Sequence, residues 1–270
     1  MNTIKIRTTK INTINMTSVK ANNLKMNSLI KLSVKPCKFT SKLALRILKA
    51  LIVSVISLAF VASPFTAFAK EQTLQNILVF GDSLSAAYGL SPEEGWAALL
   101  QKKLNGFSQT HFAYRYNVIN ASVSGETTSG GLTRLEATLK KNNPSIVILE
   151  LGANDGLRGL PISEMQSNLE KMLQLCQKHQ AKVLLLGMRI PPNYGAKYTQ
   201  GFNQTYENLS KQYKTGLVPF MLNNIATKPM LIQQDGLHPN TLGQPLILEN
   251  IWPQLLPILK VSALKLQSTK

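Results

Sequence analysis

The chain has 270 residues and a formal net charge of +17, but 11 of its 30 Lys and Arg residues and none of its 13 Asp and Glu residues lie in the first 69 positions. Positions 70–270 therefore carry a net charge of only +6, which removes the main reason to propose a nucleic-acid-binding protein. One cysteine, Cys37, lies in the first segment, and the other, Cys176, lies in the second, which excludes a disulfide scaffold and a Cys-based zinc site.

A secretory signal peptide is predicted at the end of the basic segment. An apolar stretch of 13 residues runs from Ala50 to Ala62, with basic residues before it and the small-residue site Ala67–Ala69 after it. This pattern predicts cleavage between Ala69 and Lys70. The stretch is shorter than the ~20 residues that a membrane-spanning helix needs, which disfavours an anchor. We therefore expect a secreted, periplasmic protein with no stable membrane span after cleavage.

The first 40 or so residues are rich in Asn, Thr, Lys and Ile and show no apolar periodicity. Met16 and Met26 both lie within them, so we expect that the start site is assigned too far upstream. An organelle transit peptide is a weaker alternative, because such peptides favour Arg and this segment has mostly Lys. The chain thus divides into an N-terminal extension with a signal peptide, 1–69, and one compact domain, 70–270.

Four short apolar runs in the second part predict β-strands, at 77–80, 118–119, 146–151 and 183–188. They are β-branched or leucine-rich, and helix-like segments separate them. Near-continuous apolar strands that alternate with helices are typical of a mostly parallel sheet covered on both faces. The sequence therefore predicts a three-layer α/β/α fold.

Capping residues and apolar periodicity predict the helices. Ser91 with Glu94, and Ser163 with Gln166, are capping boxes at two helix starts. The spacing of Leu169, Met172, Leu173 and Cys176 places Cys176 on a buried stripe, where it is a core residue and not a reactive thiol. Further helices are predicted at 130–141, 197–213 and 241–259, the last of them kinked or ended early by Pro245, Pro253 and Pro257.

Small polar clusters follow three of the predicted strands, and a fourth precedes the final helix. They are Gly81–Ser85, Ser124–Thr127, Gly152–Gly156 and Asp235–Pro239. In an open parallel sheet the ligand crevice lies beyond the carboxyl ends of the strands, so the first three clusters are expected to meet there. Together the four supply a hydroxyl, a carboxylate, an imidazole, an amide and several glycines, which acyl transfer requires.

The chemistry of acyl transfer gives each residue a role. A serine attacks a carbonyl only if a base takes its proton, and His238 is the natural base for Ser83. Asp235 lies three residues before His238, so a helix-like turn lets its carboxylate orient the ring. The backbone N–H groups of Ser83 and Gly125, with the Asn154 amide, can donate to the oxyanion, and Gly125 lets the backbone approach the substrate.

The four clusters, in this order, resemble the blocks GDSLS, Gly, GxND and DxxH of the SGNH hydrolases, also called GDSL esterases. GDSLSAAYGL, ASVSGETTSGGLTRL, ELGANDGLRG, RIPPNYG and QDGLHPN resemble the secreted bacterial subgroup of multifunctional thioesterase I, arylesterase and lysophospholipase. The resemblance runs from about Leu74 to the C-terminal helix. It implies a five-stranded, flavodoxin-like sheet and hydrolysis of acyl esters and thioesters through an acyl-enzyme. It makes Ser83 the nucleophile, Gly125 and Asn154 oxyanion donors, Asp235 the orienting acid and His238 the base.

The ordinary α/β-hydrolase fold has the same order of Ser, Asp and His, but its nucleophile lies in a GxSxG elbow. Position 85 is Ser here, and Ser83 comes only 14 residues after the predicted cleavage site. These differences exclude that fold.

The other polar residues near these clusters have structural explanations. His111 has no acid at a useful spacing, and His179 falls in the last turn of a predicted helix, where it can interact with the helix dipole. Asp82 and Asp155 flank the predicted site and are expected to hydrogen-bond loop backbone. No GxGxxG, Walker loop or HExxH is present, so we expect no cofactor and no metal.

The substrate is expected to be a small-molecule ester or thioester. The loops 157–161 and 190–194 are apolar with Pro and Gly and follow two strands beside the site, which suits an acyl chain, although ordinary loop packing explains them equally well. Arg158 and Arg189 can meet a phosphate head group or simply lie on the surface. The candidate substrate-binding residues are Leu157, Arg158, Ile190, Pro191 and Tyr194.

The resemblance favours fatty acyl thioesters, aryl esters and lysophospholipids as substrates. A carbohydrate O-acetyl esterase of the same superfamily is the alternative enzyme. A secreted lipid carrier is the non-enzymatic alternative, but it predicts the loss of a catalytic residue, and none is missing. We expect a monomer that binds no nucleic acid.

Overall fold

The computed structural model describes residues 73–111 and 115–268. The predicted signal peptide, the upstream methionines, Cys37 and the cleavage site at Ala69 lie outside the described residues, so the division at that site stays a prediction.

Five parallel strands form one sheet in the order β2-β1-β3-β4-β5. This is the strand order of flavodoxin-like folds, so the predicted three-layer α/β fold with a five-stranded sheet is confirmed. The central strands β1 and β3 are apolar on both faces, and their residues from Ile77 to Phe80 and from Ile146 to Leu149 are fully buried. The strands are β1 (Leu74–Gly81), β2 (Arg115–Asn120), β3 (Ile146–Glu150), β4 (Lys182–Leu186) and β5 (Gly216–Val218).

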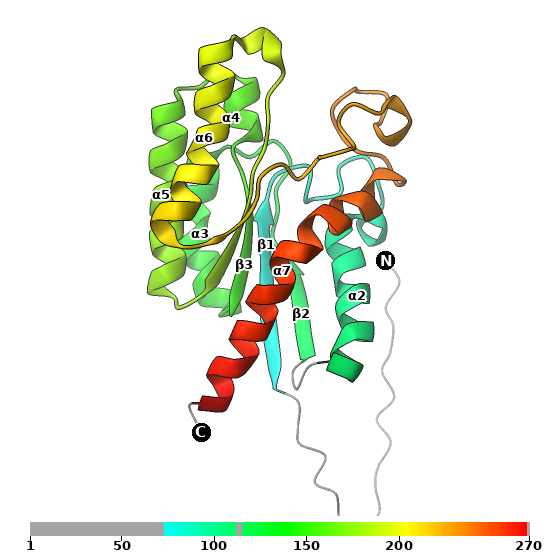
Figure 1. Ribbon diagram of the computed structural model, residues 1–270, viewed down its shortest axis with the longest axis vertical. Coiled ribbons are helices and arrows are strands. Elements are labelled where there is room, and N and C mark those ends of the chain that lie inside the picture. Colours follow the sequence, from blue (N-terminus) through cyan, green and yellow to red (C-terminus); the bar gives the residue numbers. More distant parts are fainter. Residues whose placement is uncertain (1–72, 112–114, 269–270) are drawn as a thin grey trace, which may run out of the picture. The chain divides into compact units, whose positions relative to one another are not determined.

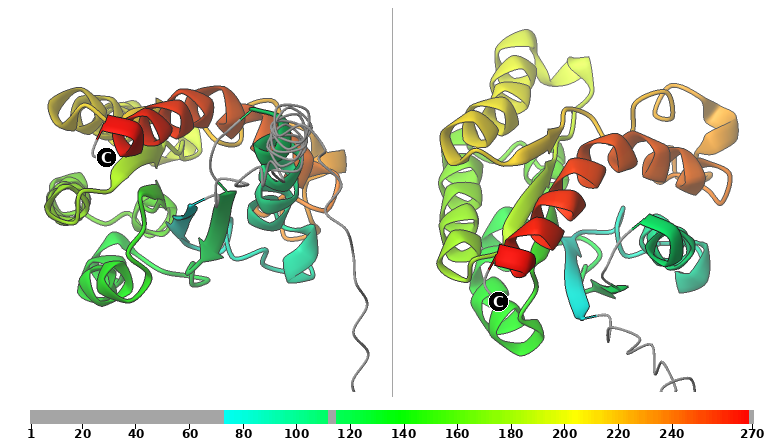
Figure 2. Two further views of the ribbon diagram at one scale, coloured as in Figure 1. Left: turned by 90° about the horizontal axis from the view of Figure 1, so that it is seen from below. Right: turned by 60° about the horizontal axis from the view of Figure 1, so that its bottom comes forward.

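Helices cover both faces of the sheet, as Figures 1 and 2 show. On one face lie α2 (Trp96–His111) and α7 (Gly243–Ser268), and on the other lie α3 (Thr128–Asn142), α5 (Ile162–Lys178) and α6 (Ala196–Tyr213). The short helix α4 (Ala153–Leu157) and three 3₁₀ turns, η1 (Pro92–Glu94), η2 (Pro192–Tyr194) and η3 (Pro229–Leu231), complete the described elements. Within 73–111 and 115–268, no helix has the length and hydropathy of a membrane span.

Two helices begin at other residues than predicted. The carboxylate of Glu94 accepts hydrogen bonds from the Ser91 backbone and hydroxyl, but this capping box closes the turn η1, and α2 begins only at Trp96. In α5 the capping position is Pro161, so Ser163 lies inside the first turn and does not cap the helix. The buried stripe of α5 is confirmed, and burial raises the pKa of the Cys176 thiol to about 12, which makes it unreactive.

The prolines of the last helix do not end it early, as one part of the prediction had it. Helix α7 runs to Ser268 with Pro253 and Pro257 inside it. Ile247, Ile251, Leu255 and Leu259 are buried at four-residue spacing. Burial of each such side chain contributes about 1.5–3 kcal/mol. The four together offset the ~3 kcal/mol cost of each proline.

Candidate active site

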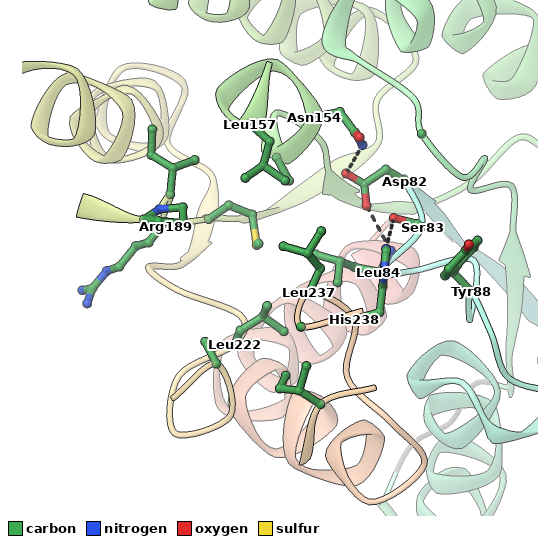
Figure 3. Close-up of a pocket in the computed structure, with 18 of the residues that line it drawn as sticks. Asp82, Ser83, Leu84, Tyr88, Asn154, Leu157, Arg189, Leu222, Leu237 and His238 are labelled. Atoms are coloured by element: carbon green, nitrogen blue, oxygen red, sulfur yellow. Dashed lines mark hydrogen bonds between the residues drawn. The ribbon is translucent and has the colours of Figure 1, made fainter. Parts of the chain in front are cut away.

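Four loops bring the predicted site residues to one edge of the sheet. Ser83 follows the end of β1, Gly125 lies between β2 and α3, and Asn154 follows β3 in α4. Asp235 and His238 lie in the loop between η3 and α7, and Figure 3 shows His238 directed toward Ser83. The clusters that follow β1, β2 and β3 thus meet beyond the carboxyl ends of the strands, and the loop before α7 completes the group.

The side chains of Ser83, His238 and Asp235 form a hydrogen-bonded chain. The distance from His238 Nε2 to Ser83 Oγ is 2.8 Å, and the distance from His238 Nδ1 to Asp235 Oδ2 is 2.6 Å. A carboxylate beside Nδ1 favours the tautomer with hydrogen on Nδ1, which leaves Nε2 free to accept the hydroxyl proton. The geometry therefore suits proton transfer from Ser83 to His238.

Asp235 is held as an ion by its own turn. Partial burial disfavours the charged carboxylate, but hydrogen bonds from the backbone N–H groups of Leu237 and His238 and from the His238 ring outweigh it and lower the Asp235 pKa to about 2. The two backbone bonds measure 2.9 and 3.0 Å. Asp235 can therefore stabilise an imidazolium cation throughout the neutral and mildly acidic range.

Two backbone N–H groups at the site have no acceptor within the part of the chain that the structure describes. Among the described residues, none accepts a hydrogen bond from the backbone N–H groups of Ser83 and Gly125. Gly125 has φ +78°, and a Cβ built there lies 3.9 Å from its nearest neighbour, the Arg158 guanidinium. The left-handed conformation therefore favours glycine at position 125, and the space around it in the free protein would admit a Cβ. Such free donors can stabilise an oxyanion.

The third predicted donor, the Asn154 amide, already has acceptors. Its Nδ2 donates to Asp82 Oδ2 at 3.0 Å and to the Glu126 carbonyl oxygen at 3.1 Å. An oxyanion bound beside Ser83 has to share one of these hydrogens, so Asp82 affects how readily Asn154 acts as a donor.

Asp82 and Asp155 bond loop backbone, as the sequence predicts. Asp82 Oδ1 accepts from the Leu84 N–H at 3.0 Å and so stabilises the turn that carries Ser83. Asp155 accepts from the backbone and hydroxyl of Thr128 at 2.9 and 2.5 Å, at the first turn of α3. The two aspartates thus position the loops on which Ser83 and Gly125 lie.

A cavity of about 370 Å³ opens beside Ser83 and His238. Three of the candidate substrate-binding residues, Leu157, Ile190 and Pro191, line it. The other two do not line it: Arg158 donates to the Gly125 carbonyl at 3.0 Å, and Tyr194 donates to the Leu157 carbonyl at 2.7 Å.

The lining of the cavity is mostly apolar. Arg189 contributes to it, but its guanidinium points away from Ser83 in Figure 3 and lies 5.1 Å from the Phe220 ring. A cavity of this size and character can bury an acyl chain. Its other apolar members are Leu84, Ala153, Met188, Phe220, Leu222, Ala226, Ile232 and Leu237.

Two residues beside His238 are missing from the predicted site, although one of them, Tyr88, lies within the quoted block GDSLSAAYGL. The ring of Tyr88 lies over the His238 ring, with centroids 4.6 Å apart. Gln233 connects the loops of Ser83 and His238, because its Nε2 donates to the carbonyls of Tyr88 and Pro239 at 2.8 and 3.1 Å. Its backbone N–H donates to the His238 carbonyl at 2.8 Å. No motif marks a glutamine whose partners are backbone carbonyls 145 and 6 residues away in sequence.

Replacement of Gln233 by glutamate should lower kcat by roughly 10- to 100-fold, since a carboxylate cannot donate to the two carbonyls and leaves them unpaired. Steady-state kinetics together with thermal unfolding will measure the effect. Gln234→Glu is the matched control, because Gln234 is the exposed neighbour. If Gln233→Glu keeps the kcat of this control, Gln233 does not position the site.

The chain is similar to proteins of one family. It matches the model of the GDSL-like Lipase/Acylhydrolase family over residues 79–246. It is 47% identical to esterase TesA of Pseudomonas aeruginosa over 190 residues, which are 70% of this chain and 92% of that protein. It is 39% identical to the protein named thioesterase 1/protease 1/lysophospholipase L1 of Escherichia coli K12, over 70% of this chain and 87% of that protein.

The fold also matches solved structures. The crystal structure of the psychrotrophic esterase EstA from Pseudoalteromonas sp., inhibited by monoethylphosphonate, has a TM-score of 0.64 and 43% identity. The match covers 69% of this chain and 99% of that one.

Proposed function

Because the chain belongs to the GDSL-like lipase/acylhydrolase family, it is an ester hydrolase, and we propose that Ser83, His238 and Asp235 perform its reaction through an acyl-enzyme. The observation that carries this assignment is the hydrogen-bonded chain from Ser83 Oγ through His238 to Asp235 at the edge of the cavity.

The acylation step follows from this geometry. Ser83 Oγ attacks the carbonyl carbon while His238 Nε2 takes the hydroxyl proton, and Asp235 stabilises the resulting imidazolium. The negative charge on the substrate oxygen is met by the N–H groups of Ser83 and Gly125 and by the Asn154 amide. The bond to the alcohol or thiol then breaks, and the leaving group takes the proton from His238.

Deacylation repeats the step with water as the nucleophile. His238 Nε2 takes a proton from water, whose oxygen attacks the acyl carbon, and the bond to Ser83 Oγ breaks. The proton returns to Ser83 as the carboxylic acid leaves. The enzyme is then ready for another substrate, and water is the only co-reactant that the balance needs.

The proposed substrates are acyl esters and thioesters with an apolar acyl chain, including aryl esters and lysophospholipids. The apolar cavity beside Ser83 supports this choice, since it offers a chain of several methylenes a surface to bury against. The names of two relatives, an esterase and a thioesterase/lysophospholipase, agree with it.

Turnover of p-nitrophenyl octanoate should exceed turnover of the acetate by at least about 10-fold in kcat/KM, because each buried methylene contributes about 0.8 kcal/mol. A panel of acetyl, octanoyl and longer esters, with matched thioesters and with Ser83→Ala as the blank, measures the preference. A preference for acetate favours an O-acetyl esterase. Binding of lipid without turnover of any ester favours a lipid carrier and contradicts the proposal.

We also propose that the protein is exported to the periplasm with cleavage between Ala69 and Lys70, and that it acts as a monomer. The basic, apolar and AxA segments of the first 69 residues support export. Sequencing of the N-terminus of the secreted protein tests the cleavage site directly.

A further inference from the structure

A buried glutamate lies beneath the turn that carries the nucleophile. Glu150 is the last residue of β3 and is fully buried. Its Oε2 accepts hydrogen bonds from the Asp82 N–H at 3.2 Å and from the Ser85 hydroxyl at 2.8 Å. Gly81 leaves room for this carboxyl, since a Cβ there would lie only 2.6 Å from Oε2. Glu150 therefore contacts the residues on both sides of Ser83 in sequence but does not contact the substrate cavity.

The surroundings of Glu150 disfavour an ionised carboxylate. Its second oxygen, Oε1, is buried and has no hydrogen-bond partner among the described residues. Within the same residues, no Lys or Arg forms an ion pair with it. An unpaired charge in this position, next to a second carboxyl group, carries a large desolvation cost.

The titratable groups that interact with Glu150 do not relieve this cost. Asp82, from the loop after β1, repels a charge on Glu150, and Tyr206, from α6, interacts with it as a neutral phenol. Farther out, His238 interacts with Asp82, and Asp155 interacts with Tyr206. Of these groups only His238 can become a cation, and it does so when it takes the Ser83 proton.

The two carboxyl groups differ in what they bond. Burial raises the pKa of Glu150 well above its usual value of 4.5, with repulsion from Asp82 as the second cause. Burial also raises the pKa of Asp82, to about 6, but the hydrogen bonds from Leu84 and Asn154 favour its charged form. Since Asp82 has donors on both oxygens and Glu150 has them on one, Glu150 is the group that keeps a proton.

We propose that Glu150 is a positioning residue that works as a neutral acid: it retains its proton at neutral pH and fixes the Ser83 turn through the Asp82 N–H and the Ser85 hydroxyl. A chain of contacts then runs from Glu150 through Asp82 to the Asn154 amide. A neutral Glu150 leaves Asp82 as the only charged member of this pair of neighbouring carboxyl groups. A second charge there would oppose the oxyanion.

Glu150→Gln tests the protonation state without an activity assay. For a buried carboxyl with a raised pKa, the unfolded chain ionises first, so the wild-type protein loses unfolding free energy as the pH rises above 4.5. Glutamine, which is isosteric with the protonated acid, does not suffer this loss. The unfolding temperature of Glu150→Gln relative to wild type should therefore rise by about 4 °C or more between pH 4 and pH 7.

Glu207→Gln is the matched control, because Glu207 is exposed on α6. The unfolding temperature of this variant relative to wild type should stay nearly constant between pH 4 and pH 7. A difference for Glu150→Gln that stays constant, or that falls as the pH rises, overturns the inference. A falling difference is the behaviour of a carboxylate that is ionised and stabilised in the folded protein.

The positioning role rests on the proposed function and needs a kinetic readout. At pH 7, Glu150→Gln should keep kcat/KM within about threefold of wild type, whereas Glu150→Leu, which cannot accept either hydrogen bond, should lose roughly 10- to 100-fold in kcat with little change in KM. Equal losses in both variants, or no loss in Glu150→Leu, contradict the role. If the wild-type protein hydrolyses no ester at all, the proposed function fails instead, and the unfolding experiment still tests the neutral acid.

Discussion

Replacement of Ser83 by alanine should lower kcat/KM for a p-nitrophenyl ester by about four orders of magnitude. The loss is this large because, among residues 73–111 and 115–268, no other hydroxyl is bonded to His238, so the covalent route is lost. KM should change little, since the apolar lining of the cavity is untouched. Steady-state kinetics of purified enzyme will measure both quantities, with ester hydrolysis in enzyme-free buffer as the background.

The matched control is Ser163→Ala, which removes an exposed hydroxyl from α5 and should leave activity unchanged. A fluorophosphonate probe followed by peptide mapping gives a second, independent readout. The adduct is expected on Ser83 in the wild-type protein and should be absent in Ser83→Ala. An adduct on any other residue, or a fully active Ser83→Ala protein, would falsify the assignment of the nucleophile.

Asp235→Asn is expected to lower kcat by about 10³- to 10⁴-fold while the protein stays folded. The asparagine oxygen can still accept from the backbone N–H groups of Leu237 and His238, as Asp235 Oδ1 does. Its NH₂ group then faces the His238 ring and donates to Nδ1. This arrangement forces the ring hydrogen onto Nε2, so the imidazole can no longer accept the Ser83 proton.

Thermal unfolding and kinetics of Asp235→Asn should be measured together. Glu164→Gln, at an exposed acid on α5, controls for the loss of one negative charge. A loss in kcat no larger than that of Glu164→Gln would mean that Asp235 does not orient the base. A large loss accompanied by unfolding would assign Asp235 to the stability of its turn rather than to the chemistry.

The sequence predicts the parts of this protein in which local pattern and tertiary structure agree. The strands β1 and β3 are near-continuous apolar runs, and such runs are typical of the buried centre of a parallel sheet. The meeting of the polar clusters then follows from the topology, because the carboxyl ends of parallel strands lie at the same edge of the sheet. Strand β5 has only the three residues Gly216–Val218, which is too short to leave a periodic signal.

Three features that the sequence does not predict share a physical cause, which is contact between distant residues. Pro253 and Pro257 predict an interrupted helix, but the buried stripe of α7 outweighs the local preference. Gln233 and Glu150 bond partners that are far away in sequence and that are mostly backbone atoms. A backbone partner leaves no mark in the identity of the residue that it belongs to. Gln233 therefore could not be found from the sequence alone, and Glu150, although it opens the block ELGANDGLRG, could not be given a role.

The separation of Ser83 from His238, 155 residues along the chain, also controls when the protein first becomes able to act. A ribosome completes the nucleophile loop early, but the base is added only shortly before the last helix. Until then the growing polypeptide carries Ser83 without its proton acceptor and is inactive as a hydrolase.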